Sequence, residues 1–213
     1  MSYEVKNYYE LDFDNGVVNN AFVYDLKESL RASGFPARLD PNDFDLENSL
    51  KRAKKLGSVP SGTAHDCFLK GIVVNFDLTL THTAWLQLSR YHFIDIVSSM
   101  SKMYRLTKMD LNKQCTKNVD ERIIKIVQEK INYFNSIEDP EEKKEYFNTL
   151  VDNVPLGLKL TARVTTNYLQ LKTIKRQRKN HKLKEWHKII EFIDSLPFFK
   201  EFTERDEEAR RNH

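Results

Sequence analysis

The sequence predicts an α/β (α+β) fold, in which a mixed sheet carries flanking helices. Apolar residues alternate with polar ones at 71–80 and again at 156–164, which is typical of strands with one buried face. Each of these segments is followed at once by a stretch with helical spacing. A third stretch, 119–137, repeats apolar residues every three or four positions, as an amphipathic helix does.

The length and composition predict one globular domain that covers 1–213. A chain of 213 residues can bury one sizeable core, and its 40% hydrophobic and 31% charged residues are ordinary values for a globular protein. No apolar run approaches the roughly 20 residues of a membrane helix, and the acidic start of the chain lacks the apolar core of a signal peptide. We therefore expect a cytoplasmic protein without a membrane partner.

The two cysteines and the small net charge exclude further classes. Cys67 and Cys115 lie far apart, with neither a metal-binding spacing nor a disulfide framework, so we expect reduced thiols and no metal site. A formal charge of +3 is too small to indicate nucleic-acid binding by the molecule as a whole.

In the first third of the chain the patterns predict two helices. Phe22, Leu26 and Leu30 recur at helical spacing, so we expect a helix at 17–33 that Gly34 can end. A short basic helix is expected at 46–56, with Gly57 closing it. The segment 58–66 has the composition of a loop.

The strand expected at 71–80 leads directly into a helix that either Thr81 or Thr83 can cap. We expect that helix to include 84–92, and an apolar segment follows it at 93–97. Helices are next expected at 119–137 and 140–151, before a second strand at 156–164. Thr165 or Thr166 can then cap a long basic helix at 167–196, which Pro197 ends.

Gln87 and Arg90 are the first candidate site residues. They are three positions apart and so face the same way on a helix, near the end of the preceding strand. Arginine offers a forked donor for phosphate, and glutamine offers a donor and an acceptor for the edge of a pyrimidine. A solvated helix face is the simpler interpretation of the same pair.

Hydroxyls and one ammonium group follow at Ser98, Ser99, Ser101 and Lys102, where they can hold phosphate oxygens or merely end a helix. His65, in the loop before the first predicted strand, can stack on a ring or move a proton, although most loop histidines do neither. The basic run at 172–188 suits an RNA backbone or a nucleotide phosphate, or is a solvated surface. The sequence has no phosphate-binding glycine loop, no zinc spacing and no serine nucleophile elbow.

The segment 87–104, QLSRYHFIDIVSSMSKMY, resembles the signature of flavin-dependent thymidylate synthases. That signature consists of Gln, a short spacer, Arg-His-Arg and, a few residues on, Glu-x-Ser-x-Arg-Tyr. Gln87 and Arg90 match its first half, and Ser101 and Tyr104 match its second half after one inserted residue. The chain departs from the signature at Tyr91, His92, Ser99 and Met103.

The order of the elements is also similar to that family from Arg31 to the last helix. In the later block 154–178, Asn167 matches the flavin-contacting Asn of the family, and Arg178 falls at its nucleotide-binding Arg. Two further family arginines are replaced, by Val151 and Leu169.

The resemblance implies an FAD-dependent methyltransferase of dTMP biosynthesis, which assembles as a homotetramer with active sites built from several subunits. Its substrate is dUMP, methylenetetrahydrofolate supplies the one-carbon group, and NADPH reduces the flavin. No protein nucleophile is needed, because the cofactor carries the chemistry. The residues carried over as dUMP contacts are Gln87, Arg90, Ser99, Ser101, Lys102 and Arg178, and Arg178 is also the catalytic residue. Those carried over as flavin contacts are Ser33, His65, Arg90, Tyr91, His92 and Asn167.

Three functional hypotheses follow. The first is the flavin-dependent modification of a deoxyuridine nucleotide. The second is a nucleotide-binding protein on the same fold that no longer binds flavin. The third is RNA binding through 172–188, which the modest overall charge makes the weakest of the three.

Overall fold

The structure, a computed structural model, describes residues 4–204. These residues form two compact units. Unit 1 takes the described residues of Met1–Asp77, Tyr91–Asp95 and Val164–His213, and unit 2 takes Leu78–Arg90 and Ile96–Arg163. The single domain expected over 1–213 stays a prediction.

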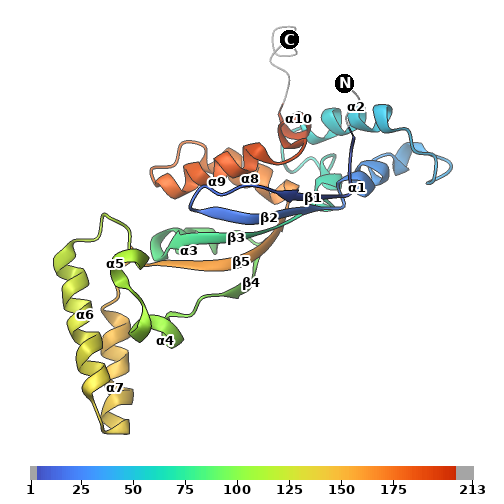
Figure 1. Cartoon of the computed structure of the whole chain (residues 1–213). Helices are drawn as coiled ribbons and strands as arrows, with labels where there is room; N and C mark the ends of the chain where they lie inside the picture. Colours follow the sequence, from blue (N-terminus) through green and yellow to red (C-terminus); the bar gives the residue numbers. More distant parts are fainter. Residues whose placement is uncertain (1–3, 205–213) are drawn as a thin grey trace. The chain divides into compact units, whose positions relative to one another are not determined.

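A five-strand antiparallel sheet, in the order β1-β2-β3-β5-β4, confirms the expected α/β class (Figure 1). Its strands are β1 (Tyr8–Leu11), β2 (Val18–Tyr24), β3 (Val73–Thr81), β4 (Ile94–Ser99) and β5 (Lys159–Asn167). The register of the first pair places Tyr8 opposite Tyr24. The two strands predicted from alternation, β3 and β5, are confirmed.

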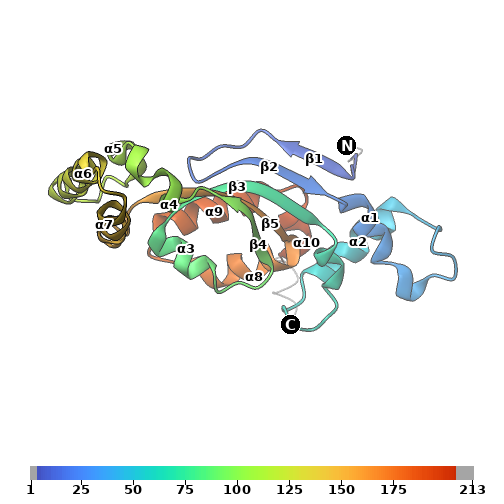
Figure 2. The same cartoon turned by 90° about the horizontal axis from the view of Figure 1, so that it is seen from below.

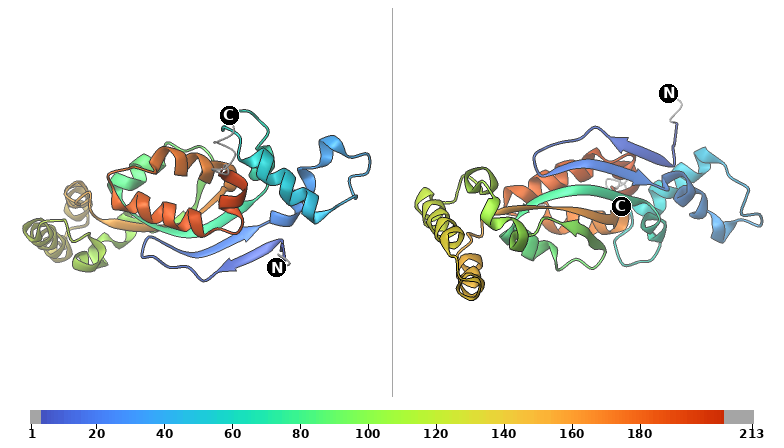
Figure 3. Two further views of the ribbon diagram at one scale, coloured as in Figure 1. Left: turned by 90° about the horizontal axis from the view of Figure 1, so that it is seen from above. Right: turned by 60° about the horizontal axis from the view of Figure 1, so that its bottom comes forward.

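In unit 1 the helices α8 (Tyr168–Arg178) and α9 (Lys184–Ser195) lie side by side, as the left view of Figure 3 shows, and α9 contacts β2. The ring of Phe192 on α9 lies 4.8 Å from that of Phe76 on β3. Trp186 and Phe192 are fully buried, so the apolar face of α9 forms much of the core of this unit.

Two further helices of unit 1 approach each other closely. α2 (Leu46–Gly57) confirms the expected short basic helix, and it contacts both α1 (Leu26–Ala32) and α10 (Phe199–Thr203) (Figure 2). A Cβ on Gly57 would lie 2.3 Å from the carbonyl oxygen of Phe202, so glycine permits this contact. Short 3-10 helices complete the connections, η1 at Phe35–Ala37 and η2 at Cys67–Lys70.

Unit 2 contains a helical hairpin made of α6 (Glu121–Ser136) and α7 (Pro140–Asp152), which lie side by side in Figure 1. Both helices were expected, and Asp120 and Asp139 cap them. The shorter elements of this unit are α3 (His82–Leu88), α4 (Lys102–Arg105), η3 (Leu106–Lys108) and α5 (Leu111–Gln114). Val127, Ile131 and Leu150 join the core cluster of the hairpin.

The helix expected at 17–33 was wrong in its first half. Residues 18–24 form β2, and α1 begins only at Leu26. Between them Asp25 adopts a left-handed conformation with φ of 60°, which aspartate tolerates and which breaks the helical path. Phe22 therefore shares its spacing with Leu26 and Leu30 without sharing their helix.

Three other expectations were also wrong. The helix expected through 84–92 ends at Leu88, and the apolar segment beyond it lies in the strand β4. The single basic helix at 167–196 is two helices, α8 and α9, separated at 179–183. Its cap is Asn167, whose Oδ1 accepts from the backbone N–H of Gln170 at 3.0 Å, and neither Thr165 nor Thr166 has this role. Within residues 4–204, no helix is long and apolar enough to cross a membrane.

Candidate functional site

Ser33 and His65, two of the predicted flavin contacts, line one hollow of unit 1, although they come from different loops. Ser33 directly follows α1, and His65 belongs to the loop 58–66. The hollow has a volume of about 600 Å³. We call it the Ser33 hollow, and its remaining lining residues are Ala32, Pro36, Ala37, Arg52, Leu56, Ala64, Cys67 and Phe68.

The polar groups of the Ser33 hollow are held from neighbouring elements. The Ser33 hydroxyl donates to the carbonyl oxygen of Leu30 at 2.7 Å and accepts from Nε of Arg52 at 3.2 Å. His65 is exposed, and it follows Ala64, whose φ is 63°. A mostly apolar hollow with a few fixed polar groups suits a ring system.

A buried ion pair fixes the loop that carries His65. Nζ of Lys172 on α8 donates to Oδ2 of Asp66 at 2.7 Å and to the carbonyl oxygen of Val59 at 2.7 Å. Asp66 is 1% exposed, so this carboxylate depends on Lys172 for its partner. The contact therefore positions both ends of the loop that leads into the hollow.

A second cluster in unit 1 brings together Arg178 and Tyr91, which the sequence assigned to dUMP and to flavin. Nε of Arg178 donates to the Tyr91 hydroxyl at 2.9 Å. The guanidinium carbon lies 4.7 Å from the centre of the buried Trp186 ring and 5.6 Å from that of Tyr91. Cation–π contacts with two rings hold the charge in place and leave the terminal nitrogens of Arg178 for other acceptors.

His181 borders the same cluster, with its ring 5.9 Å from that of Trp186. Burial, followed by the positive charge of Arg178 and the neighbouring His187, lowers the pKa of His181. The Nδ1 atom of His181 accepts from the backbone N–H of Leu183 at 3.1 Å.

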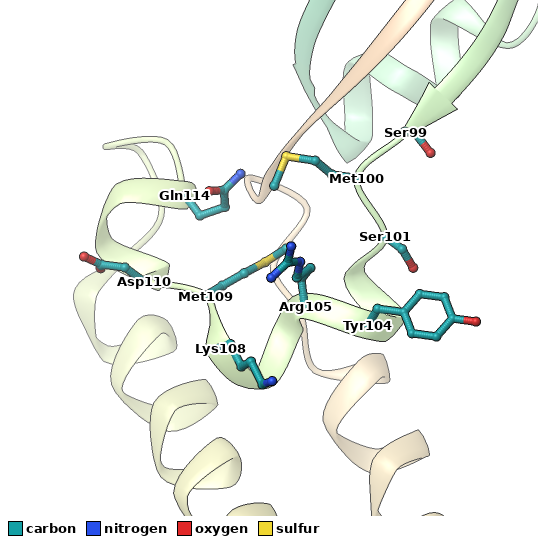
Figure 4. A pocket seen from close by; sticks show the side chains of 9 residues that line it. All are labelled: Ser99, Met100, Ser101, Tyr104, Arg105, Lys108, Met109, Asp110 and Gln114. Carbon is teal, nitrogen blue, oxygen red and sulfur yellow. The ribbon is translucent and has the colours of Figure 1, made fainter.

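Unit 2 contains a hollow of about 650 Å³ that includes Ser99, Ser101 and Tyr104 of the signature segment. Figure 4 shows its lining, with Ser101 and Tyr104 on one side and Asp110 and Gln114 on the other. We call it the Ser99 hollow, and its remaining lining residues are Met100, Arg105, Lys108 and Met109.

Arg105 and Lys108 bring positive charge to the lining of the Ser99 hollow, which also includes the carboxylate residue Asp110. The side-chain hydrogen bond from Lys113 lowers the pKa of Asp110, whose carboxylate stays charged. Arginine, lysine and serine side chains are groups that can bind phosphate oxygens. The hollow therefore combines predicted site residues with basic groups that the signature did not indicate.

The other predicted residues lie outside these three groups. Gln87 is half-buried on α3, whereas Arg90 is exposed and follows the Ser89 cap of that helix, so the two do not share a helix face as expected. Lys102 begins α4, and His92 is exposed. Asn167 caps α8, which uses its side-chain oxygen.

Four residues that contact predicted ones or share their hollows were not predicted from the sequence: Arg52, Arg105, Lys108 and Trp186. Arg105 had a sequence signal, because it directly follows Tyr104 at the end of the signature segment. Arg52 and Trp186 had none, because only the folded chain brings them to Ser33 and Arg178.

The fold of this chain is similar to that of solved structures. No protein-family model and no curated protein matches the sequence. The structure is similar to that of thymidylate synthase X (ThyX) from Helicobacter pylori with FAD and dUMP, with a TM-score of 0.62 and 16% identity over 84% of this chain and 92% of that chain. A second structure of flavin-dependent thymidylate synthase ThyX from Helicobacter pylori, also with FAD and dUMP, has a TM-score of 0.56 and 16% identity over 82% and 89%. The chain therefore has a ThyX-like fold, as the signature resemblance implied.

Proposed function

We propose that this protein is a ThyX-like enzyme that carries out reductive methylation, or a related one-carbon modification, at C5 of dUMP. It would bind FAD, with methylenetetrahydrofolate as one-carbon donor and NADPH as reductant. The observation that carries the proposal is that predicted contacts from distant parts of the sequence meet on a ThyX-like fold: Ser33 with His65, and Tyr91 with Arg178.

The Ser33 hollow would hold part of the flavin. Its apolar walls suit a ring, while Ser33, Arg52 and His65 provide polar contacts at its edge. A reduced flavin supplies hydride, so the protein needs to bind and orient the reactants rather than provide a nucleophile.

Arg178 would act on the pyrimidine. Its charge is fixed by two rings and by the Tyr91 hydroxyl, and a fixed positive charge stabilises negative charge that develops on a bound base.

The Ser99 hollow would bind a phosphate group. Ser99 and Ser101 supply hydroxyls, and Arg105 and Lys108 supply charge in place of the arginine that the signature has at Met103. Each hydrogen bond to a charged group contributes about 1.5–3 kcal/mol, so two cations offset much of that loss.

A homotetramer is part of the proposal. β4 is last in the order of the sheet, and its Ile96 and Val97 are 56% and 63% exposed. An edge strand with apolar side chains on both faces is normally covered by another chain. A second copy of the chain would cover this edge. A cytoplasmic location stays a prediction.

Nucleotide binding without flavin is the second candidate. It is favoured by the signature positions His92, Ser99 and Met103, where charged contacts are lost. RNA binding has less support, because three lysines of the basic segment already form ion pairs. Lys172 pairs with Asp66, and Lys188 pairs with Glu191. Lys175 pairs with both Asp194 and Glu204. Those pairs reduce the charge available to an RNA backbone.

The absorbance spectrum of the purified protein, before and after addition of excess FAD, tests the proposal. We expect a yellow protein, a rise in melting temperature with dUMP, and dTMP formation when FAD, methylenetetrahydrofolate and NADPH are supplied. A protein that stays colourless with excess FAD but is stabilised by dUMP would support the second candidate instead. RNA affinity that falls steeply with salt would revive the third.

A further inference from the structure

Two arginines of unit 1, Arg38 and Arg52, converge on one hydroxyl group. The terminal nitrogens Nη2 of both side chains donate to the Ser49 oxygen, at 3.2 Å from Arg38 and 2.9 Å from Arg52. Ser49 is fully buried on α2, so this oxygen fixes where the two guanidinium groups meet. Arg38 is held further by the carbonyl oxygen of Arg31 at 3.1 Å, and Arg52 by the Ser33 hydroxyl.

The backbone of Gly34 lies against both guanidinium groups. A Cβ at that position would be 2.6 Å from Nη2 of Arg52 and 2.8 Å from Cζ of Arg38. Any larger residue would therefore push both side chains away. Both guanidinium groups are thus packed against the backbone where α1 ends.

The pair has no carboxylate partner among residues 4–204. Of the acidic groups on the neighbouring segments, Glu28 pairs with Arg31 and Glu47 with Lys51. The carboxylates of Asp40 and Asp45 accept from backbone N–H groups of their own turns. All hydrogen bonds of Arg38 and Arg52 therefore go to neutral oxygens.

Two like charges that share a partly buried place are unfavourable unless an anion joins them. Burial, followed by the charge of Arg38, lowers the pKa of Arg52, which agrees with such a conflict. A guanidinium group remains charged even so, and it cannot relieve the repulsion by losing its proton. An anionic ligand would relieve it.

Arg52 also lines the Ser33 hollow, so the two features adjoin. The walls of the hollow contributed by Leu56, Phe68 and Pro36 are apolar, and its charged corner is Arg52. A ligand that fits both parts has a flat, weakly polar ring and a phosphate group. Two arginines provide forked donors that match phosphate oxygens.

We propose that Arg38 and Arg52 together bind a phosphate group of a nucleotide whose ring system occupies the Ser33 hollow. That the nucleotide is FAD rests on the proposed function. The phosphate site itself rests only on the two arginines, on Ser49 and on the missing counter-charge.

The test measures binding of inorganic pyrophosphate, FAD and riboflavin by calorimetry. Riboflavin has the same ring as FAD but no phosphate. We expect the wild type to bind pyrophosphate, and to bind FAD at least tenfold more tightly than riboflavin. In the double variant Arg38→Gln/Arg52→Gln, one equivalent of bound pyrophosphate is lost, and the affinity for FAD falls to that for riboflavin. Pyrophosphate bound at the Ser99 hollow would persist in this variant.

The matched control is Lys51→Gln/Lys55→Gln, which removes two exposed charges from α2, the helix that carries Arg52. This variant should bind all three ligands as the wild type does. If the glutamine variant does not fold, as judged by circular dichroism, Arg38→Lys and Arg52→Lys replace it. They keep the charge but lose the fork, so binding of pyrophosphate and FAD should weaken while that of riboflavin stays unchanged.

The outcomes separate this site from the proposed function. Pyrophosphate binding that is lost in the arginine variants supports the site, even where neither FAD nor riboflavin binds, and that result would count against the flavin enzyme alone. An equal loss of FAD and riboflavin affinity would show that the arginines only shape the hollow, and would overturn the site. Wild-type protein that binds none of the three ligands, or arginine variants that bind them unchanged, would overturn it as well.

Discussion

Arg178 combines two kinds of contact that a lysine cannot reproduce. Its planar guanidinium lies over the rings of Trp186 and Tyr91, and its Nε donates to the Tyr91 hydroxyl. A lysine would keep the positive charge but lose the fork and the stacking of the planar group. The position of the charge, rather than its presence, therefore distinguishes the two residues here.

We expect Arg178→Lys to weaken dUMP binding about tenfold, or ~1.4 kcal/mol, and to abolish most dTMP formation. Calorimetry with dUMP and an activity assay measure the two effects. Arg176→Lys, an exposed position on the same helix, is the control and should change neither. Equal dUMP affinity in Arg178→Lys and wild type would remove Arg178 from the nucleotide site.

The two cysteines should differ in reactivity towards a thiol reagent. Cys67 is exposed and lines the Ser33 hollow, whereas Cys115 is 5% exposed and its burial raises the pKa of its thiol. A thiolate is the reactive form, so a raised pKa slows Cys115 at pH 8. We expect one thiol to react in the native protein and two in denaturant.

A ligand in the Ser33 hollow should also slow the native reaction. Addition of FAD is expected to protect Cys67, and mass spectrometry of the labelled peptides identifies which thiol reacts. Rapid labelling of Cys115 in the native state would contradict its burial, and unchanged labelling of Cys67 at saturating FAD would place the flavin elsewhere.

At single residues, the site could be predicted only where a family pattern covers the position. Ser33, His65 and Arg178 were chosen from the resemblance, and the first two share a hollow. Arg38 and Arg52 follow no pattern, because their meeting depends on a connection that folds back between α1 and α2. Such convergence has no periodicity that a sequence could reveal.

Among the elements, β4 shows a similar limit. Both faces of this strand are exposed at 95–99. It therefore lacks the alternation of buried and exposed residues that identified β3 and β5. The break between α8 and α9 was missed because 179–183 contains neither proline nor glycine. Strong alternation or amphipathic spacing was sufficient for β3, β5, α6 and α7, which bury one clear face.

The exposed side of β4 leads to a prediction about assembly. Val97→Lys places a charge in the apolar edge, and we expect it to shift the protein from the tetramer towards smaller species in light scattering after gel filtration. Ser98→Lys adds the same charge at the neighbouring exposed position without removing apolar surface, and should leave the tetramer largely intact. A tetramer that persists in Val97→Lys would exclude this edge from the interface.

At the scale of the molecule, the strands connect the two units. β3 passes from unit 1 into unit 2 after Asp77, and β5 passes back after Arg163. β4 is also divided, because Ile94 and Asp95 belong to unit 1 and the rest of the strand to unit 2. Unfolding one unit would therefore break three strands whose remaining residues belong to the other. This connectivity favours the single cooperative domain that the chain length predicts.

The two tryptophans can test that cooperativity, because Trp85 belongs to unit 2 and Trp186 to unit 1. Trp186→Phe leaves Trp85 as the only reporter, and Trp85→Phe leaves Trp186. Into each background we would introduce Gly57→Ala. Its Cβ would lie 2.3 Å from the carbonyl oxygen of Phe202, and both residues belong to unit 1. We expect this clash to lower the free energy of unfolding by about 1–3 kcal/mol. In a single domain this change lowers the urea midpoint reported by both tryptophans to a similar extent. If only the Trp186 midpoint falls, the units unfold separately, and the chain contains two domains rather than one.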